Sequence, residues 1–337
     1  MKIFIGLPTW LGDSVMASAA LHMIFEHFLA LDEKLNKKSE FVLYGSFVST
    51  ELFKEAKNVR VYVEEKKHRF TNFYKLSKAL GCFDYAFSFR SAFSAKLMLF
   101  MLKSKHKFCF DKAKNRDLHQ VLKYLYFVEN ALKVQAKNSD LFLPIKAFEN
   151  LGQEAQNKLF EKFNITKGKK LLGINAGAKY GSAKRWSEEY FAKVAQDFSA
   201  THQILIFGVA SEGEICAKIA HILAQNGISA LNLCTKTSIK ELCELISALD
   251  IFISNDSGAM HIAAAYATPT IAVFGPTKFT QTSPWHNKNA RLVYLNLPCQ
   301  PCMQRTCPLK HHKCMQDLRP ELVIQETRAL LANTKIF

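Results

Sequence analysis

Apolar strand-like runs that alternate with helix-like segments are the feature that most constrains this chain. They are clearest beyond about residue 170, where each run is short and bounded by polar turns. The runs are Leu171–Asn175, Gln203–Phe207, Ala230–Leu233, Ile251–Ser254, Thr270–Phe274 and Leu292–Leu295. Strands that are apolar on both faces and joined by helices form parallel sheets covered on both sides. The sequence therefore predicts a doubly wound α/β domain.

The first half shows a similar but weaker alternation, and the 337 residues fit two domains. A strand at Lys2–Leu7 and a helix from about Ser14 to Leu29 open it. Further strands are expected at Glu40–Tyr44, Val59–Val63 and Phe83–Phe89. The polar segment Asn164–Lys170 contains a glycine and precedes a new strand, so it is the best linker. We expect domains over 1–167 and 168–320, and a last helix within 321–337 that packs on either domain.

The chain is strongly basic, with 45 Lys and Arg against 29 Asp and Glu, a formal charge of +16. Such an excess attracts nucleic acid, anionic membranes or phosphorylated substrates, and it also fits a solvated surface. Basic residues cluster at Lys66–Arg69 and Lys103–Lys107. Without a helix-turn-helix, zinc-finger or stacked-aromatic signature, we expect no nucleic-acid partner.

The sequence also predicts a cytoplasmic protein. No apolar run reaches the ~18 residues that a membrane span needs. Asp13 comes too early for the apolar core of a signal peptide.

The turn Asn255–Gly258 follows one buried run and precedes a small-residue helix that carries His261. A helix N-terminus presents unpaired N–H groups and attracts phosphate. Gly258 lets a ligand approach, and Asp256 can cap the helix or accept hydrogen bonds from a sugar. Ordinary helix capping by Asp256 and Ser257 also accounts for these residue types. The alternative is a site for a nucleotide diphosphate.

Gly12 and Asp13 occupy the corresponding turn after the first strand. Asp13 either caps the following helix or acts as a general base on an attacking hydroxyl. Trp10 beside it offers a face on which a sugar could stack, or belongs to the core.

A loop of small residues, Asn175–Trp186, follows another strand and ends with Lys184 and Arg185. Lys184 can neutralise a leaving diphosphate without a metal, although a surface loop would look the same. Glu212 stands at a third strand-to-helix turn, where it could bind ribose hydroxyls or simply complement the helix dipole. Neither GxGxxG nor GxxxxGK[ST] occurs, which argues against dehydrogenases and P-loop enzymes.

Two further segments attract attention. Cys299, Cys302, Cys307 and Cys314 lie close together with His311 and His312 between them. A structural zinc site and reduced or redox-labile thiols both remain open, while disulfides are disfavoured in the cytosol. Segment Ala92–Leu102 could touch a membrane surface, although a buried helix followed by a basic loop is the commoner arrangement.

Taken together, these residues resemble the lipopolysaccharide heptosyltransferases, the inverting glycosyltransferases that use ADP-heptose, and more closely their heptosyltransferase II branch. The resemblance covers nearly the whole chain, and the order of its motifs is specific. The motifs are Pro8–Asp13, the Gly177–Trp186 loop, Asn255–His261, Phe274–Thr277 and the late cysteine cluster.

The resemblance implies a GT-B fold, with two Rossmann-like domains facing across a cleft, the acceptor on the first and ADP-heptose on the second. Asp13 matches the general base and Lys184 the lysine that binds the donor phosphates. The donor-binding positions are Glu212, Asp256, Ser257, Gly258 and His261. Trp10, Gly12 and Arg90 are the acceptor-side candidates, with Arg90 able to meet an acidic sugar.

The same resemblance implies transfer of heptose to the inner core of a lipid-A-linked acceptor at the inner face of the inner membrane. It implies no cofactor and no catalytic metal. Heptosyltransferase II acts on the first heptose of that core. Heptosyltransferase I, acting on Kdo2-lipid A, remains the alternative within the family. A non-catalytic protein that binds nucleotide sugars or polyanions is the alternative of another class.

Overall fold

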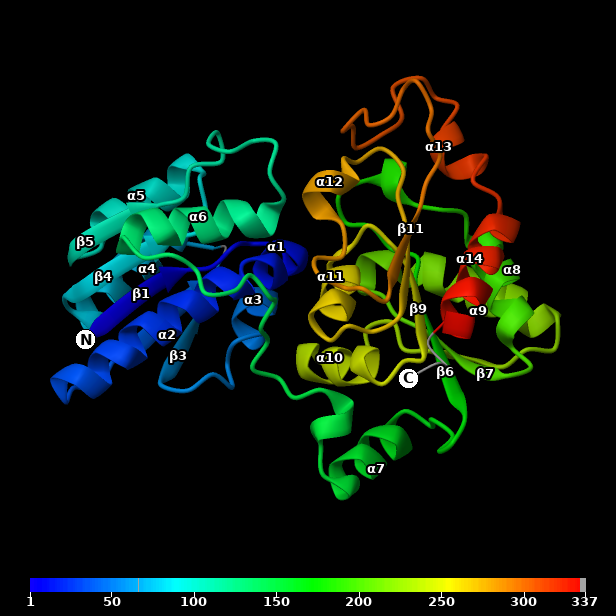
Figure 1. The fold of residues 1–337 in the computed structure, drawn as a ribbon, viewed down its shortest axis with the longest axis horizontal. Coiled ribbons are helices and arrows are strands. Elements are labelled where there is room, and N and C mark those ends of the chain that lie inside the picture. The colour runs from blue at the N-terminus through cyan, green and yellow to red at the C-terminus, as the bar shows by residue number, and fades with distance from the viewer. Residues whose placement is uncertain (66, 334–337) are drawn as a thin grey trace. The chain divides into compact units, whose positions relative to one another are not determined.

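The computed structural model describes residues 1–65 and 67–333, which form two compact units, Met1–Ile145 and Lys146–Phe337 (Figure 1). Lys66 of the first basic cluster and residues 334–337 of the expected last segment lie outside the described residues. Both units are parallel sheets flanked by helices, which confirms the α/β fold class.

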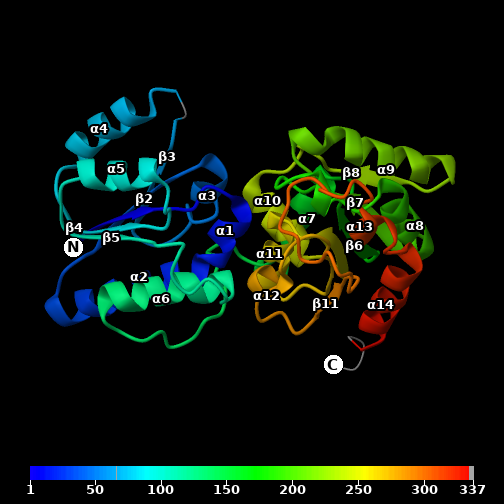
Figure 2. The same ribbon diagram turned by 90° about the horizontal axis from the view of Figure 1, so that it is seen from above.

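The N-terminal unit is built on a five-stranded sheet in the order β3-β2-β1-β4-β5. Every recorded strand pair in it is parallel. Helices α2 and α6 cover one face, and α4 and α5 cover the other (Figure 2). The strands are β1 Lys2–Gly6, β2 Glu40–Gly45, β3 Val59–Val63, β4 Phe83–Ser88 and β5 Ser104–Cys109. The helices are α1 Leu11–Met16, α2 Ser18–Leu35, α3 Phe47–Glu51, α4 Arg69–Leu80, α5 Phe93–Met101 and α6 Gln120–Leu132.

Two expectations about the N-terminal unit need correction. The basic run Lys103–Lys107 is not a loop, because most of it lies in the edge strand β5, paired with β4 from Phe83 to Ser88. Its lysines are exposed, as is common on edge strands, where charge discourages pairing with another sheet. The single helix expected from Ser14 consists instead of α1 and α2. The second continues to Leu35, where Asn36 takes a left-handed conformation (φ 47°) that ends it.

The C-terminal unit contains a six-stranded parallel sheet in the order β11-β10-β9-β6-β7-β8. All six strands expected in this half are present. They are β6 Lys170–Asn175, β7 His202–Ile206, β8 Ala230–Asn232, β9 Ile251–Asn255, β10 Thr270–Val273 and β11 Ala290–Val293. The helices are η1 Phe148–Asn150, α7 Gln153–Lys162, η2 Ser182–Lys184, α8 Glu188–Phe198, η3 Ala210–Glu212, α9 Gly213–Gln225, α10 Ile239–Ser247, α11 Gly258–Ala265, α12 Phe279–Thr282, α13 Lys313–Gln316 and α14 Pro320–Asn333.

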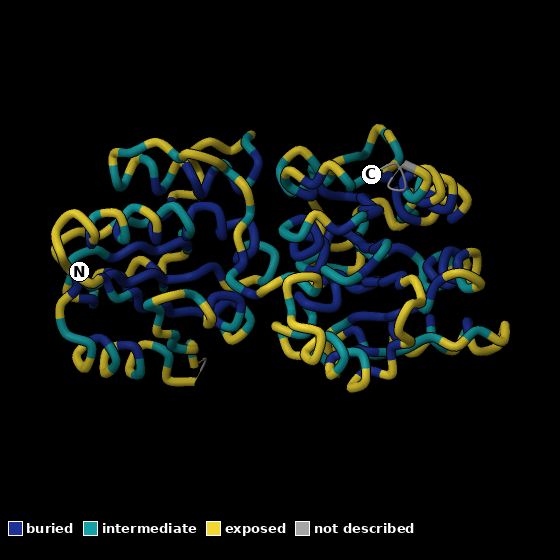
Figure 3. Tube along the Cα trace, turned by 60° about the horizontal axis from the view of Figure 1, so that its bottom comes forward, coloured by how far each residue is buried: buried dark blue, intermediate teal, exposed yellow. Residues whose placement is uncertain are grey.

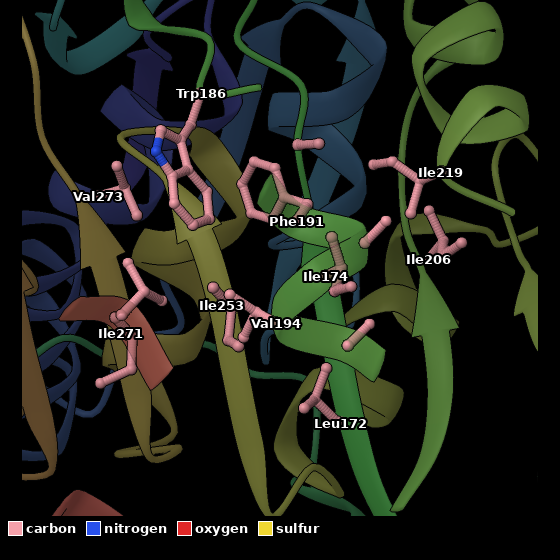
Figure 4. Close-up of a cluster of buried hydrophobic side chains, with 14 of the residues drawn as sticks. Leu172, Ile174, Trp186, Phe191, Val194, Ile206, Ile219, Ile253, Ile271 and Val273 are labelled. Atoms are coloured by element: carbon pink, nitrogen blue, oxygen red, sulfur yellow. The ribbon is translucent and has the colours of Figure 1, made fainter. Parts of the chain in front are cut away.

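Apolar side chains on one face of this sheet form the main core of the unit (Figure 4). Ile174 and Ile253 from the central strands pack with Phe191 and Val194 of α8, and Trp186 joins them with 1% of its surface exposed. The central strands of both units are buried along most of their length (Figure 3). Strands buried on both faces explain why the runs read as continuous apolar segments.

The two units divide before the segment expected to link them. Residues 146–167 belong to the C-terminal unit, because Phe148 N donates to Ser247 Oγ at 2.8 Å and Thr166 N donates to Gln203 Oε1 at 2.9 Å. The division after Ile145 therefore lies some twenty residues ahead of the expected 167/168 boundary. Helix α14 packs against α8 and β11 of the C-terminal unit. Among the described helices, none combines the length and the apolar character needed to cross a membrane.

Candidate active site

Both sheets have a point where the strand order reverses, and the carboxyl ends of two neighbouring strands meet there. In the C-terminal unit these are β6 and β9, which end at Asn175 and Asn255. Ligands of doubly wound sheets bind at such switch points. Asn255 Nδ2 donates to Ala176 O at 2.6 Å, and its Oδ1 accepts from Trp186 N at 3.2 Å. Asn255 thus ties both ends of the Asn175–Trp186 loop, which we call the Lys184 loop, to β9. We did not expect this role from the sequence.

Helix α11 begins at this edge, and its N-cap is Ser257 rather than Asp256. Ser257 Oγ accepts from Met260 N and from Asn175 Nδ2, at 3.5 and 3.1 Å. Gly258 opens the helix, and His261 lies one turn along it, 3% exposed. The turn expected to bind an anion is therefore a capped helix N-terminus at the switch point.

Asp256 is instead the partner of Lys184. Lys184 Nζ lies 2.5 Å from Asp256 Oδ2, and Thr277 Oγ1 donates to the same oxygen at 2.7 Å. The two charged side chains are 11% and 4% exposed. The ammonium group also lies 4.9 Å from the centre of the Tyr180 ring. A nearly buried cation is thereby fixed beside the start of α11. We assigned no role to Thr277 or Tyr180 from the sequence, because each contacts a residue that is distant along the chain.

Glu212 is buried at the end of η3, in the connection between β7 and α9, where it faces the Asn175–Trp186 loop. Its carboxylate accepts a hydrogen bond from Val209 N at 3.1 Å. A Cβ added to Gly177 would lie 1.9 Å from Glu212 Cδ, so only glycine allows the loop to pass this close. Burial raises the pKa of Glu212, and the Val209 N–H opposes that shift. The Glu212 carboxylate therefore accepts a hydrogen bond at the start of its own helical segment, and it lies next to the Asn175–Trp186 loop.

In the N-terminal unit the switch point lies between β1 and β4, and Asp13 stands beyond β1 in the first turn of α1. Tyr124 of α6 donates through its hydroxyl to Asp13 Oδ1 at 3.4 Å. Burial and then the charge of Asp13 raise the pKa of Tyr124, so this hydroxyl stays protonated. Gly12 precedes Asp13 in α1, and Trp10 is the N-cap residue with 48% of its surface exposed.

Arg90 follows β4 at the same edge, but its contacts are internal. Arg90 Nε donates to Leu7 O at 2.5 Å, and Nη1 donates to Glu64 Oε2 at 2.6 Å. Its side chain is 10% exposed. These bonds fasten the end of β1, from which the loop to Asp13 departs. Arg90 therefore helps to fix the position of the loop that leads from β1 to Asp13.

The four late cysteines lie in a long irregular segment, residues 294–312, and at the start of α13. Together with His311 and His312 they line one small hollow. Burial, followed by the nearby Cys302, Cys299 and Cys307 thiols, raises the pKa of Cys314 to about 11. Within residues 1–65 and 67–333, no three His, Cys, Asp or Glu side chains are placed to hold a metal ion. The segment contacts the Lys184 loop, since Tyr180 Oη donates to Met303 O at 2.8 Å and Ala183 N donates to Arg305 O at 3.0 Å.

Comparison with known proteins identifies the family of this chain. The model of glycosyltransferase family 9, described as heptosyltransferase, matches residues 73–313. The chain belongs to this family. Over all 337 residues it is 54% identical to the lipooligosaccharide heptosyltransferase 2 of Campylobacter jejuni serotype O:2, with each chain fully covered. The heptosyltransferase activity that the sequence resemblance implied is therefore confirmed at the level of the family.

Solved structures of heptosyltransferases share the fold of this heptosyltransferase. The ADP-heptose heptosyltransferase II of Escherichia coli superposes with a TM-score of 0.77 at 22% identity, covering 99% of this chain and 100% of that one. The E. coli heptosyltransferase WaaC with ADP gives a TM-score of 0.69 at 14% identity, covering 98% and 100%. These likenesses confirm the GT-B fold class.

Proposed function

We propose that this family 9 enzyme is a heptosyltransferase II, which transfers L-glycero-D-manno-heptose from ADP-heptose to the first heptose of a lipid-A-linked inner core. The observation that carries the donor side is the nearly buried Lys184 cation beside the start of α11 at the sheet switch point. Full-length identity of 54% with a protein named lipooligosaccharide heptosyltransferase 2 favours this acceptor over Kdo2-lipid A.

The donor diphosphate binds where positive charge is concentrated. Lys184 and the first N–H groups of α11, from Gly258 on, stabilise the negative charge that grows on departing ADP. Asp256 orients the lysine. Ser257 and His261 contact the donor beside it. Glu212 accepts hydrogen bonds from the ribose hydroxyls. In this scheme the neutralising charge comes from the protein, so the reaction needs no catalytic metal.

The acceptor hydroxyl is activated in the N-terminal unit. Asp13 takes its proton while the oxygen forms a bond to the anomeric carbon, and the bond from that carbon to ADP breaks on the opposite side. A single displacement of this kind inverts the anomeric configuration. The Tyr124 hydroxyl orients the Asp13 carboxylate. Trp10, Gly12 and Arg90 contact the acceptor, and Arg90 also holds the loop that carries Asp13.

A structural zinc ion at Cys299, Cys302, Cys307 and Cys314 is part of the proposal. Four thiols around one hollow are the donor atoms that zinc prefers, and a metal would fix a segment without helices or strands. Because the described thiols do not converge as ligands, binding would require them to turn toward the hollow. A metal here would support the fold and take no part in transfer.

The acceptor is anchored in a lipid layer, so the enzyme acts as a cytoplasmic protein at the inner face of the inner membrane. The formal charge of +16 supports attraction to phosphorylated lipid and to the anionic leaflet. Nucleic acid is not expected as a partner.

The acceptor assay tests this function. Purified enzyme and ADP-heptose are incubated with Kdo2-lipid A and, separately, with its monoheptosylated form. Heptosyltransferase II transfers heptose only to the monoheptosylated acceptor. Transfer only to Kdo2-lipid A would show heptosyltransferase I instead. Donor binding without transfer to either would indicate a binding protein.

A further inference from the structure

Helix α5 of the N-terminal unit carries apolar side chains on both of its faces, with Lys96 also on the exposed one. Ala95, Met98 and Leu99 are buried against the sheet. On the opposite face, Phe93 is 82% exposed and Phe100 is 78% exposed. Two large apolar side chains exposed on one face of a helix mark a surface that another body covers.

Helix α4 lies beside α5 on the same face of the sheet (Figure 2). The starts of the two helices are joined, because Arg69 Nη1 donates to Ser94 Oγ at 3.2 Å. Helix α4 adds two half-exposed aromatic side chains to this face. We define the α4–α5 surface by its exposed apolar residues, which are Phe70, Tyr74, Phe93, Leu97 and Phe100.

The sequence around the α4–α5 surface has an excess of positive charge, although Glu64, just before this range, pairs with Arg69 and Arg90. From Lys67 to Cys109 the sequence has nine Lys and Arg residues and one acid, Asp84. That acid is paired with Lys105 at 2.7 Å. The exposed lysines in this range are Lys67, Lys75, Lys78, Lys96, Lys103, Lys105 and Lys107.

Some of these lysines lie against the aromatic rings of the same surface. Lys78 Nζ is 4.6 Å from the centre of the Tyr74 ring, and Lys107 Nζ is 5.8 Å from that of Phe100. Lysines whose ammonium groups stand beside exposed aromatic rings fit the boundary between lipid headgroups and acyl chains, where each residue type meets its preferred solvent.

We propose that the α4–α5 surface docks on an anionic lipid bilayer, with Phe93 and Phe100 entering the headgroup boundary. Charge complementarity selects an anionic surface, and the exposed phenylalanines select one with an apolar interior. Phe93 begins α5 just beyond β4, at the sheet edge where Asp13 follows β1. Given the proposed function, docking here brings the lipid-anchored acceptor to the edge that carries the base.

Vesicle sedimentation without donor or acceptor tests the surface directly. Wild-type protein should bind vesicles of phosphatidylcholine mixed with phosphatidylglycerol far more tightly than vesicles of phosphatidylcholine alone. The pair Phe93→Ser and Phe100→Ser should weaken binding about tenfold, because its apolar area no longer enters the lipid. Lys96→Ser should weaken it about fivefold, as one cation near an anionic surface contributes.

Matched controls lie on α2, on the opposite face of the same sheet. Leu35→Ser removes an apolar side chain that is 53% exposed, and Lys34→Ser removes an exposed cation. Both should bind vesicles like wild type, and all variants should keep the wild-type circular dichroism spectrum and melting temperature. Vesicle binding that survives loss of both phenylalanines but not of Lys96 would indicate a general polyanion surface, such as one for RNA, and overturn the proposal.

Activity separates this inference from the proposed function. With an acceptor embedded in vesicles, the phenylalanine variant should lose transfer in proportion to its lost binding. With a deacylated, water-soluble acceptor, its kcat/KM should equal that of the wild type. Equal losses on both acceptors would contradict membrane docking. Absence of transfer by the wild type on every acceptor would contradict the proposed function and leave the vesicle result standing.

Discussion

The Lys184–Asp256 pair should contribute substantially to the stability of the C-terminal unit, and Asp256→Asn tests this. The asparagine has the same shape and can still accept the Thr277 hydrogen bond, but it removes the charge opposite the ammonium group. Exposed ion pairs contribute about 0–1 kcal/mol. With exposures of 11% and 4%, this pair belongs to the buried class, in which loss of one partner costs about 3–5 kcal/mol. Because the Tyr180 ring still faces Lys184, we expect the lower end, about 3 kcal/mol.

Tryptophan fluorescence during urea unfolding can isolate the relevant unit. The chain has three tryptophans. In a Trp10→Phe background only Trp186 and Trp285 remain, and both belong to the C-terminal unit. The free energy of unfolding is measured for this parent, for Asp256→Asn, for Lys184→Met and for the double variant.

The double variant distinguishes a charge pair from two independent contributions. Removing the second charge should recover part of the loss, giving a coupling free energy of about 2 kcal/mol. Lys184→Met should also weaken calorimetric binding of ADP-heptose. A coupling below about 0.5 kcal/mol, the range of exposed pairs, would refute the argument from burial.

Three other changes give separate tests. Asp13→Asn should lower transfer about 10²- to 10⁴-fold while calorimetric affinity for ADP-heptose is unchanged, and a wild-type rate would exclude Asp13 as the base. Because burial raises the pKa of Glu212 above 4.5, its ionisation costs folding stability above the raised pKa and nothing below 4.5. Glu212→Gln should therefore raise the melting temperature at neutral pH, with a gain that fades toward pH 4.5, and a gain independent of pH would contradict this. Protein purified without chelator should hold about one equivalent of zinc, less in Cys302→Ser but not in Cys82→Ser, and less than about a tenth of an equivalent in the wild type would reject the site.

The four inner strands of the C-terminal unit, β6, β7, β9 and β10, were predictable because they are buried on both faces and bounded by polar turns. Strand β5 was not, because its lysines and histidine give an edge strand the appearance of a loop. The unit boundary was also misplaced. Residues 164–170 are polar and contain a glycine, but hydrogen bonds such as Thr166 N to Gln203 Oε1 hold this segment to the C-terminal unit. The composition of a segment indicates its exposure to solvent, but it does not indicate which residues the segment is hydrogen-bonded to.

The sequence suggested candidate site residues, but it did not indicate their partners. Lys184 and Asp256 are 72 positions apart, and they meet because β6 and β9 are neighbours in the sheet. Strand order is a property of the whole unit, so no local pattern reveals this pairing. Arg90 illustrates the same limit. It was an acceptor-side candidate after β4, and no local pattern indicated that Leu7 O and Glu64 accept hydrogen bonds from its guanidinium group.

The irregular segment 294–312 helps to position the proposed donor site, because it is hydrogen-bonded to the two loops that carry Lys184 and Thr277, whose side chains meet at Asp256. Ala183 N donates to Arg305 O beside Lys184, and Met303 N donates to Pro276 O beside Thr277, at 3.0 and 2.8 Å. A segment without helices or strands depends on such bonds for its own order, so order in the segment and order in both loops are coupled. Any event that fixes the segment, including metal binding by its thiols, should therefore increase affinity for ADP-heptose. Under the proposed function the cysteines influence the donor through the position of Lys184, with no contact to the reacting atoms.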